Sequence, residues 1–324
     1  MHRLATCPGL DPPEDVVLVE QPSADVLFLT SAGTDISCLA ASLPINPAWN
    51  DRIRALPLSC LEHPAQLDHY LNTTAEKARL IVVRLLGSRG HWSYGLEQLQ
   101  RWCGEATQRQ LIVLAGTADQ SNELHGLGSC SHELADQLSA LLREGGIDNM
   151  GQCLKALEAL LDGTHPSPDS IAVVPCPDPM AWDWRDEPGA AVGVVLYRAQ
   201  FQAGDLDLAD ALTAALRQQG LRPCLLWVSS LRDPAVQAGV LHLLDQHHHL
   251  TKAQAVDGKP LVGIQIAGSF WRSPPGFDQA SSRLRNCSPP RLICGEGQMI
   301  QRRAVLSLRG IGATSQKPMH QAIA

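Results

Sequence analysis

The sequence has 324 residues, enough for one large or two ordinary domains, and its 44% hydrophobic content can fill a sizeable core. A net charge of −7 argues against a nucleic-acid partner, and no apolar run approaches the roughly 20 residues of a membrane span. The N-terminal residues carry proline and acids where a signal peptide needs an apolar core, and the 10 cysteines form no Cys-x-x-Cys pair, so we expect a cytoplasmic protein with reduced thiols.

Strands and helices alternate through the first half of the chain. Clear strands are predicted at 24–30, 80–86 and 111–116, and weaker ones at 16–20 and 56–61. A helix is expected from Ile36, with Thr34 or Asp35 as its N-cap, and others at 63–78 and after residue 95. This alternation predicts a parallel sheet with helices on its faces.

One strand carries an unusual end. In Leu80 to Gly95, LIVVRLLGSRGHWSYG, a buried-type apolar run contains Arg84 and is followed at once by His91, Trp92 and Tyr94. Ligands of open α/β sheets bind beyond the carboxyl ends of the strands, so these four side chains are candidates for a binding site. The structural alternative is an arginine at the sheet edge with aromatic side chains that close the core.

The second half begins a second unit of the same kind. Helices are predicted at 131–143 and 149–161, followed by a proline-rich linker at 163–188 that includes a short strand at 171–174. Trp182 and Trp184 are expected to pack on the domain that follows. Strands at 191–197 and 222–228 then flank a helix with Gly220 as its C′ residue, and Pro234 opens a further helix to Leu244.

We therefore predict an α/β protein of two doubly wound parallel-sheet units, the second incomplete, followed by an irregular tail. The predicted boundaries are an N-terminal domain at 1–162, the linker at 163–188, the start of a second domain at 189–250, and the tail at 251–324. The tail holds ten Lys or Arg and three Asp or Glu, so its composition differs sharply from the acidic residues 1–250.

Several common site motifs are absent from the sequence. It has no G-x-G-x-x-G or P-loop after any predicted strand, and no G-x-S-x-G surrounds Ser229 or Ser230. The run His247-His248-His249 is adjacent in sequence, whereas metal ligands have to converge, so we assign no metal ligands. Nucleotide binding by these routes and hydrolysis by a serine nucleophile are not predicted.

Three blocks resemble the family of CobN-type large subunits of aerobic cobaltochelatase, which is related to the magnesium chelatase large subunits. They are ADVLFLTSAGTDISCLA at 24–40, HPAQLDHYLNTTAEKARLIVVRLLGSRGHWSYGLEQL at 63–99, and VGVVLYRAQFQAGDLDLADALTAALRQQGLRPCLLWVSSLRDPAV at 192–236. In this family a strand ending in Val-Arg-Leu-Leu-Gly runs into a Trp-x-Tyr-Gly motif, and later strands end in Tyr-Arg and in Ser-Ser. The resemblance covers roughly residues 1–245.

The resemblance implies an N-terminal part of a subunit that binds hydrogenobyrinic acid a,c-diamide for insertion of Co²⁺ in cobalamin biosynthesis. Companion subunits, including an AAA+ ATPase, would use ATP and Mg²⁺, which this chain itself would not bind. Arginines would pair with carboxylates of the corrinoid, and aromatic rings would stack on it. The substrate-binding candidates are Arg84, His91, Trp92, Tyr94, Tyr197, Arg198, Ser229, Ser230 and Arg232. Catalytic residues remain unassigned.

Two departures from the family limit these expectations. Asp205-Leu206 stands where the family usually has Asn-Thr, which puts a contact by that amide in doubt. The family chain is several times longer, and the resemblance fades where the charge balance changes, so we expect that the reading frame leaves the family's frame near residues 244–250. The alternatives are a real basic tail that binds a partner, a non-catalytic tetrapyrrole-binding or scaffold protein, a magnesium chelatase relative, and an unrelated α/β protein.

Overall fold

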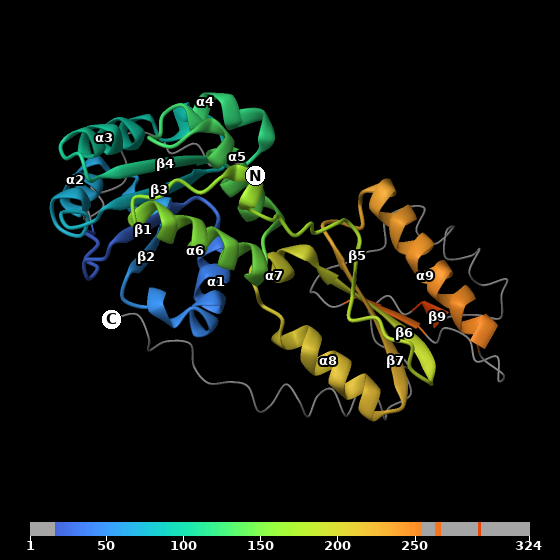
Figure 1. The fold of residues 1–324 in the computed structure, drawn as a ribbon. Coiled ribbons are helices and arrows are strands. Elements are labelled where there is room, and N and C mark those ends of the chain that lie inside the picture. The colour runs from blue at the N-terminus through green and yellow to red at the C-terminus, as the bar shows by residue number, and fades with distance from the viewer. Residues whose placement is uncertain (1–16, 255–262, 267–290, 293–324) are drawn as a thin grey trace, which may run out of the picture. The chain divides into compact units, whose positions relative to one another are not determined.

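The computed structural model describes residues 17–254, 263–266 and 291–292. It is a mixed α/β structure (Figure 1) whose chain divides into two compact units. Unit 1 comprises Met1–Pro175 with Gln202–Gly204, and unit 2 comprises Cys176–Phe201 with Asp205–Ala324. The predicted fold class, two doubly wound α/β units followed by a tail, is confirmed.

A parallel sheet forms the centre of unit 1. Its described strands are β1 (Val26–Thr30), β2 (Ile53–Pro57), β3 (Leu80–Leu85) and β4 (Gln110–Ala115). They lie in the order β2-β1-β3-β4, and every neighbouring pair is parallel. The β-branched and leucine side chains of β1 and β3 are buried on both faces, as expected for strands inside a doubly covered sheet.

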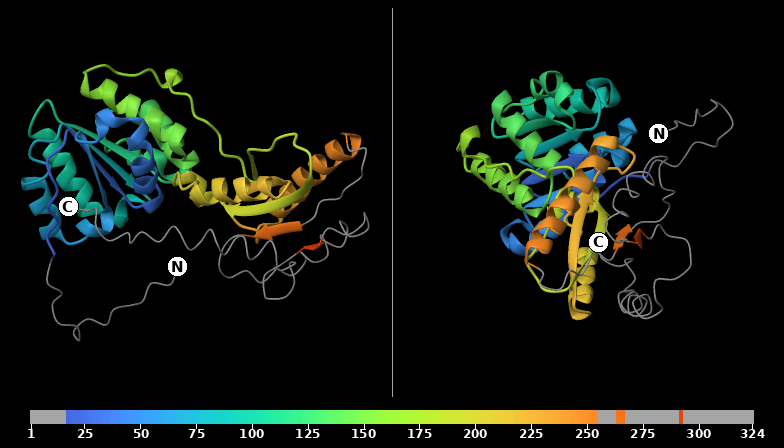
Figure 2. Two further views of the ribbon diagram at one scale, coloured as in Figure 1. Left: turned by 90° about the horizontal axis from the view of Figure 1, so that it is seen from below. Right: turned by 90° about the vertical axis from the view of Figure 1, so that its right-hand side faces the viewer.

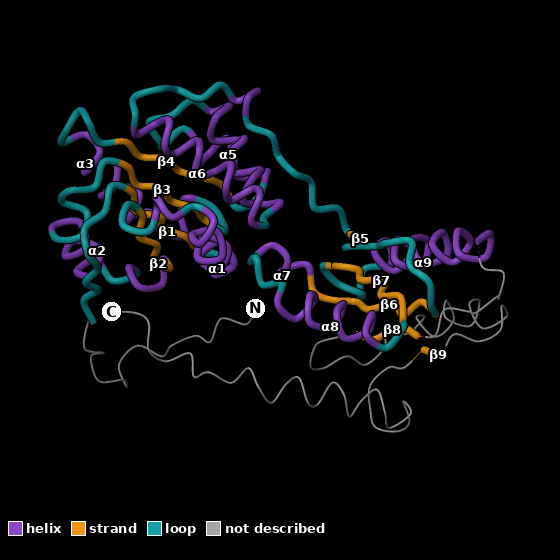
Figure 3. The backbone as a smooth tube through the Cα atoms, turned by 60° about the horizontal axis from the view of Figure 1, so that its bottom comes forward, coloured by secondary structure: helices purple, strands orange, loops and turns teal. Residues whose placement is uncertain are grey.

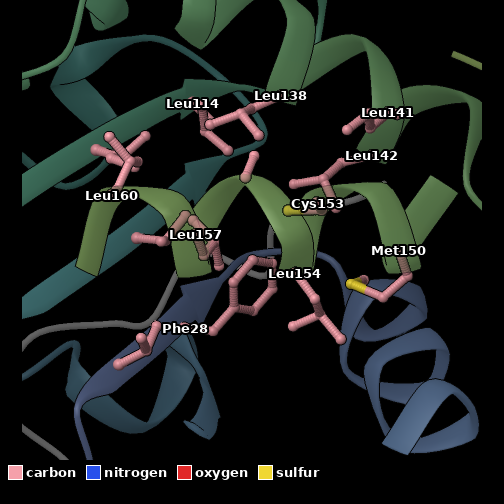
Figure 4. Close-up of a cluster of buried hydrophobic side chains, with 14 of the residues drawn as sticks. Phe28, Leu114, Leu138, Leu141, Leu142, Met150, Cys153, Leu154, Leu157 and Leu160 are labelled. Atoms are coloured by element: carbon pink, nitrogen blue, oxygen red, sulfur yellow. The ribbon is translucent and has the colours of Figure 1, made fainter. Parts of the chain in front are cut away.

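Helices cover both faces of this sheet. They are α1 (Gly33–Ser42), α2 (Pro64–Asn72), α3 (Ser93–Gly104), α4 (Ser121–His125), α5 (His132–Glu144) and α6 (Ile147–Leu161). Apolar side chains of α1, α5 and α6 pack on one face of the sheet, and those of α2, α3 and α4 pack on the other. Figure 4 shows the first of these cores, where Phe28 of β1 meets Leu154 and Leu157 of α6.

Several predicted boundaries in unit 1 are wrong. Residues 17–20 form no strand, and the strand predicted at 56–61 is β2 with a following 3-10 turn at Leu58–Leu61. Helix α1 begins at Gly33 rather than Ile36, and neither Thr34 nor Asp35 caps it. Helix α2 ends at Asn72 rather than near residue 78, although its predicted start at Pro64, behind His63, is confirmed.

Unit 2 contains a mixed sheet. Its described strands are β5 (Met180–Trp182), β6 (Ala190–Tyr197), β7 (Leu221–Val228), β8 (Gly263–Ile266) and β9 (Arg291–Leu292). They lie in the order β5-β7-β6-β8-β9, with only β5 antiparallel to its neighbour. The sheet therefore has more strands than the two predicted with certainty.

Its helices also lie on opposite faces. They are α7 (Arg198–Gln202), α8 (Asp207–Gln218) and α9 (Pro234–Gln254). Leu212 and Leu216 of α8 pack with Leu225 and Trp227 of β7, whereas α9 packs on the face that carries Leu226. Figure 2 shows α8 and α9 on the two sides of β6 and β7, and Figure 3 traces the same arrangement. Gly220 follows α8 with φ +69°, as predicted for its C′ residue.

The proline-rich segment at 163–188 contributes a strand and two tryptophans to unit 2. Residues 171–174 form no strand, and the strand in this segment is β5, further along the chain. The Trp182 ring packs edge-on against Phe201 and Trp227, and Trp184 donates a hydrogen bond from Nε1 to the Leu225 carbonyl oxygen at 2.7 Å. Both tryptophans thus belong to the core of unit 2 itself.

Candidate functional site

Both sheets have the same topological switch point. In each unit the chain leaves the first parallel strand, adds the second strand on one side of it, and then crosses to add the third on the other side: β1, β2, β3 in unit 1 and β6, β7, β8 in unit 2. Ligands of doubly wound folds bind beyond the carboxyl ends of the strands at such a point. This point lies between the ends of β1 and β3 in unit 1 and between those of β6 and β8 in unit 2, where the end of β7 continues the same carboxyl edge.

At the unit 1 edge, Arg84 is enclosed in an ion pair. Its side chain is 6% exposed and its Nη1 donates to Asp35 Oδ1, while Thr30 Oγ1 donates to Asp35 Oδ2 at 2.6 Å. Thr30 and Arg84 are direct neighbours across β1 and β3, so the sheet register brings them together. Arg84 Nε is also buried and has no hydrogen-bond partner among the described residues. Sequence reasoning assigned Asp35 to a helix cap and missed this pairing.

The loop after β3 is shaped around two glycines. Gly87 has φ +130°, and a Cβ placed there would lie 2.8 Å from Nδ1 of His91. The indole ring of Trp92 lies over Gly95, so closely that a Cβ at Gly95 would overlap it. Trp92 Nε1 donates to the Leu61 carbonyl oxygen at 3.2 Å. The Trp-Ser-Tyr-Gly motif therefore closes this loop onto the end of β2.

His91 and Tyr94 lie on the outside of the same loop. His91 is exposed, and its Nδ1 lies 3.3 Å from Ser88 Oγ. Tyr94 is 38% exposed and donates from its hydroxyl to Asp68 Oδ1 at 2.8 Å. This hydrogen bond to Asp68 raises the pKa of Tyr94. Of the four unit 1 candidates, these two present their side chains to solvent, whereas Arg84 is enclosed and Trp92 is partly buried.

The corresponding edge of unit 2 brings its candidates together. Tyr197 pairs with Val228 across β6 and β7, so Arg198 and Ser229 come next at adjacent strand ends. Tyr197 and Arg198 are both partly buried, and Arg198 Nε donates to Cys176 Sγ at 3.1 Å. Two polar side chains and an aromatic ring thus share the carboxyl edge of this sheet.

Ser229, Ser230 and Arg232 form the turn into α9. Ser229 N donates to Asp178 Oδ1 at 3.1 Å, and Ser230 Oγ accepts from Arg232 N at 3.2 Å. Ser229 and Arg232 are exposed and Ser230 is partly buried. The backbone of this turn is held by hydrogen bonds, while the Arg232 side chain lies at the surface.

The same turn occurs in unit 1. Ser59-Cys60-Leu61-Glu62-His63-Pro64 follows β2, and Ser229-Ser230-Leu231-Arg232-Asp233-Pro234 follows β7. In both turns the leucine is buried, the first serine is exposed, and the proline is the first residue of a helix. The side chain before the proline, His63 or Asp233, accepts a hydrogen bond from the backbone N–H two residues later. The shared Ser-x-Leu pattern has a structural role as a strand-to-helix connection in each unit, and it leaves the charged fourth position free to differ.

A serine, a histidine and an aspartate meet behind β4. His125 Nε2 lies 3.0 Å from Ser139 Oγ and accepts from the Ala115 backbone at 3.3 Å, and His125 Nδ1 lies 3.2 Å from Asp136 Oδ1. The geometry resembles a hydrolytic triad, but Ser139 is fully buried and the Nε2 acceptor is shared with a backbone amide. Burial lowers the pKa of His125. This cluster, which sequence reasoning missed, ties α4 and α5 to the end of β4.

The described residues form neither a metal site nor a membrane span. No group of three His, Cys, Asp or Glu side chains in this part of the chain is arranged to hold a metal ion. The side chains of the His247-His248-His249 run lie outside the described residues, as do Cys287 and Cys294. Within the same part of the chain, no helix combines the length and the apolar surface that crossing a membrane requires.

The fold and the two edges define a class of protein, a doubly wound α/β chain with polar and aromatic side chains at its strand ends. Residues 139–259 match the CobN/magnesium chelatase family model. The aerobic cobaltochelatase subunit CobN of Sinorhizobium is 30% identical over 318 residues, covering 90% of this chain and 23% of that protein. The corresponding subunit of Pseudomonas aeruginosa is 28% identical over 258 residues, and this match covers 76% of this chain and 20% of that protein.

A solved structure, the catalytic subunit of cobaltochelatase from Mycobacterium tuberculosis, is similar with 22% identity and a TM-score of 0.49, over 68% of this chain and 18% of that one. On the sequence matches, the chain belongs to the CobN/magnesium chelatase family as a CobN-type fragment. It spans less than a quarter of the length of the curated relatives.

The match also bears on residues beyond 250. An alignment that covers 90% of the chain must include some of them, because residues 1–250 make up only about 77% of the 324. In addition, β8 pairs in parallel with β6 and so extends the sheet of unit 2. A change of reading frame near residues 244–250 stays a prediction, and the extent of this match weighs against it.

Proposed function

We propose that this chain acts as part of the large subunit of an ATP-dependent cobaltochelatase, which inserts Co²⁺ into hydrogenobyrinic acid a,c-diamide in cobalamin biosynthesis. The observation that supports it most is the similarity to two aerobic cobaltochelatase subunits over most of this chain. Co²⁺ is a substrate of the assembled enzyme. An AAA+ ATPase and a companion subunit would supply ATP hydrolysis with Mg²⁺, in keeping with a sequence that carries no P-loop.

In this proposal the chain contributes contacts to the corrinoid rather than catalytic groups. The acidic macrocycle offers carboxylates to arginines and a flat face to aromatic rings. At the unit 2 edge, Arg198 and Arg232 would meet carboxylates, with Tyr197, Ser229 and Ser230 beside them. At the unit 1 edge, Tyr94 and His91 would make contacts through their exposed side chains, while Trp92 holds their loop in place and Arg84 contributes charge.

A second candidate is a tetrapyrrole-binding protein that inserts no metal by itself. The observation that favours it is the share of the relatives that the chain spans, 23% and 20%. On this view the isolated chain binds the corrinoid, and insertion needs the remainder of a large subunit as well as the partners.

Titration of the purified chain with hydrogenobyrinic acid a,c-diamide tests the binding claim. We expect a saturable change in corrinoid absorbance, and a smaller change with a porphyrin that carries fewer carboxylates. Adding Co²⁺, ATP and the two partner subunits to this chain should yield no cobalt insertion until the missing part of a large subunit is supplied. Absence of any spectral change with the corrinoid would contradict the proposal.

A further inference from the structure

The unit 1 switch point holds buried guanidinium N–H groups that have no hydrogen-bond partner among the described residues. Arg84, Thr30 and Asp35 lie together at the ends of β1 and β3, and both Asp35 oxygens are already engaged. Along β3, Leu80 and Val82 contact the core under α1, α5 and α6, so strand alternation directs Arg84 to the same face.

Arg143, in the last turn of α5, adds a second cation on that face. It is partly buried, and its Nη1 is enclosed without a hydrogen-bond partner among the described residues. Burial lowers the pKa of Arg143 and the nearby charge of Arg84 lowers it further, whereas Asp136 and Glu144 oppose this shift. Two guanidinium groups therefore approach each other, and each keeps one buried N–H unpaired.

The first turn of α1 opens onto the same place. Asp35 belongs to this turn, whose N-cap residue Ala32 offers no side-chain acceptor to the first backbone N–H groups of the helix. A Cβ added to Gly33 would meet no heavy atom of the described chain within 4 Å. This is an open position beside a helix N-terminus, at the point where the doubly wound fold places ligands.

A buried N–H group without a hydrogen-bond partner is costly unless an acceptor meets it. We propose that this edge of unit 1 binds an anionic group, a carboxylate or a phosphate, held by Arg84, Arg143 and the first turn of α1. Asp35 then orients Arg84 instead of neutralising the whole cluster. The site shares Arg84 with the unit 1 edge proposed above for the corrinoid but uses none of its exposed side chains, and its test through Arg143 does not depend on the cobaltochelatase function.

Isothermal titration calorimetry of the full chain with inorganic phosphate, and separately with succinate, tests this site at constant ionic strength set with sodium chloride. We expect saturable binding of at least one anion, weakened at least tenfold in Arg143→Gln. Arg101→Gln is the matched control, because Arg101 is also in the last turn of its helix but is exposed and bonds to Gln98 at 3.0 Å. Its affinity should equal that of the unmodified chain.

Hydrogen exchange of the unmodified chain shows where the anion binds. The bound anion should slow exchange in peptides that contain Gly33 and Thr34, and leave the connection around Ser229 unchanged. Binding of phosphate alone would point to a phosphate ligand, and binding of succinate to a carboxylate. No saturable binding of either anion, or equal affinity in Arg143→Gln and the unmodified chain, would overturn the proposal, whatever the result of the corrinoid titration.

Discussion

The two sheets share a topology, but the arginines at their carboxyl edges lie in different environments. In unit 1, Arg84 is 6% exposed and is locked to Asp35 behind Thr30. In unit 2, Arg232 is exposed on the turn into α9, and its backbone N–H donates to Ser230 Oγ. The comparison teaches that an arginine at the carboxyl edge of a doubly wound sheet has no fixed role: one is built into the core, and the other lies at the surface.

The strongest way to break this comparison is to remove the buried charge. Arg84→Met leaves Asp35 enclosed without its partner, so we expect a loss of about 3–5 kcal/mol in the free energy of unfolding of unit 1. Arg232→Gln, at the exposed position, should change stability by less than about 0.5 kcal/mol. Urea unfolding followed by circular dichroism measures both.

The double variant Arg84→Met with Asp35→Asn is the control for the first change, since it removes both charges and should recover part of the lost stability. A loss below about 1 kcal/mol for Arg84→Met alone would contradict the enclosed ion pair.

A glycine tests how tightly the loop after β3 is closed. In Gly95→Ala the new methyl group would overlap the Trp92 ring, which we expect to cost about 1–3 kcal/mol. Gly104, at the other end of the same helix, has open space around it, so Gly104→Ala should be neutral or slightly stabilising. Thermal unfolding of the pair checks this, and equal stabilities would argue against the Trp92 packing.

Acid should weaken unit 1 through His125. Burial lowers the pKa of His125 in the fold, so the unfolded chain takes up a proton that the folded one does not as pH falls below about 6.5. Stability should then drop by up to about 1.4 kcal/mol per pH unit. Asp136 raises this pKa, while His132 and Arg143 lower it further.

The measurement is urea unfolding between pH 8 and pH 5, compared with His125→Asn. The variant should be less stable at pH 8, because Ser139 and the Ala115 amide lose their acceptor, and should show a shallower dependence on pH. An unchanged slope would mean that other groups dominate the acid sensitivity.

The smallest effect on stability is expected in the strand-to-helix turn that the two units share. Ser230→Cys converts the turn of unit 2 to the Ser-Cys-Leu sequence of unit 1. Since both turns bury the leucine and open a helix at proline, stability should change by less than about 0.5 kcal/mol. A loss above about 1.5 kcal/mol, read from thermal unfolding, would show that the two connections are not equivalent.

The sequence predicts local features well where one residue type allows one conformation. Gly220 at a C′ position and Pro64 at the start of a helix are confirmed, as are the apolar strands β1, β3 and β4. It fails where a contact depends on distant residues. Asp35 is a good N-cap by local propensity, yet its carboxylate bonds to an arginine 49 positions later.

The prediction of the candidate site residues fails for the same reason. Strand ends could be located from apolar runs, so Arg84, Tyr197 and Ser229 were placed at the correct edges. Which side chains face solvent could not be derived, because that depends on register and on packing between strands. The cluster of His125, Ser139 and Asp136 joins two helices, α4 and α5, and carries no local signal. The short strand β5 was hidden in a proline-rich segment.

The most direct test of the account is corrinoid binding by the exposed edge of unit 2. We predict that Arg232→Gln raises the dissociation constant for hydrogenobyrinic acid a,c-diamide about tenfold or more, as expected for one charged hydrogen bond of about 1.5–3 kcal/mol. Lys155→Gln, an exposed charge in the middle of α6 and not at a strand end proposed to bind, should leave it unchanged. Equal affinities for Arg232→Gln and the unmodified chain would contradict the account.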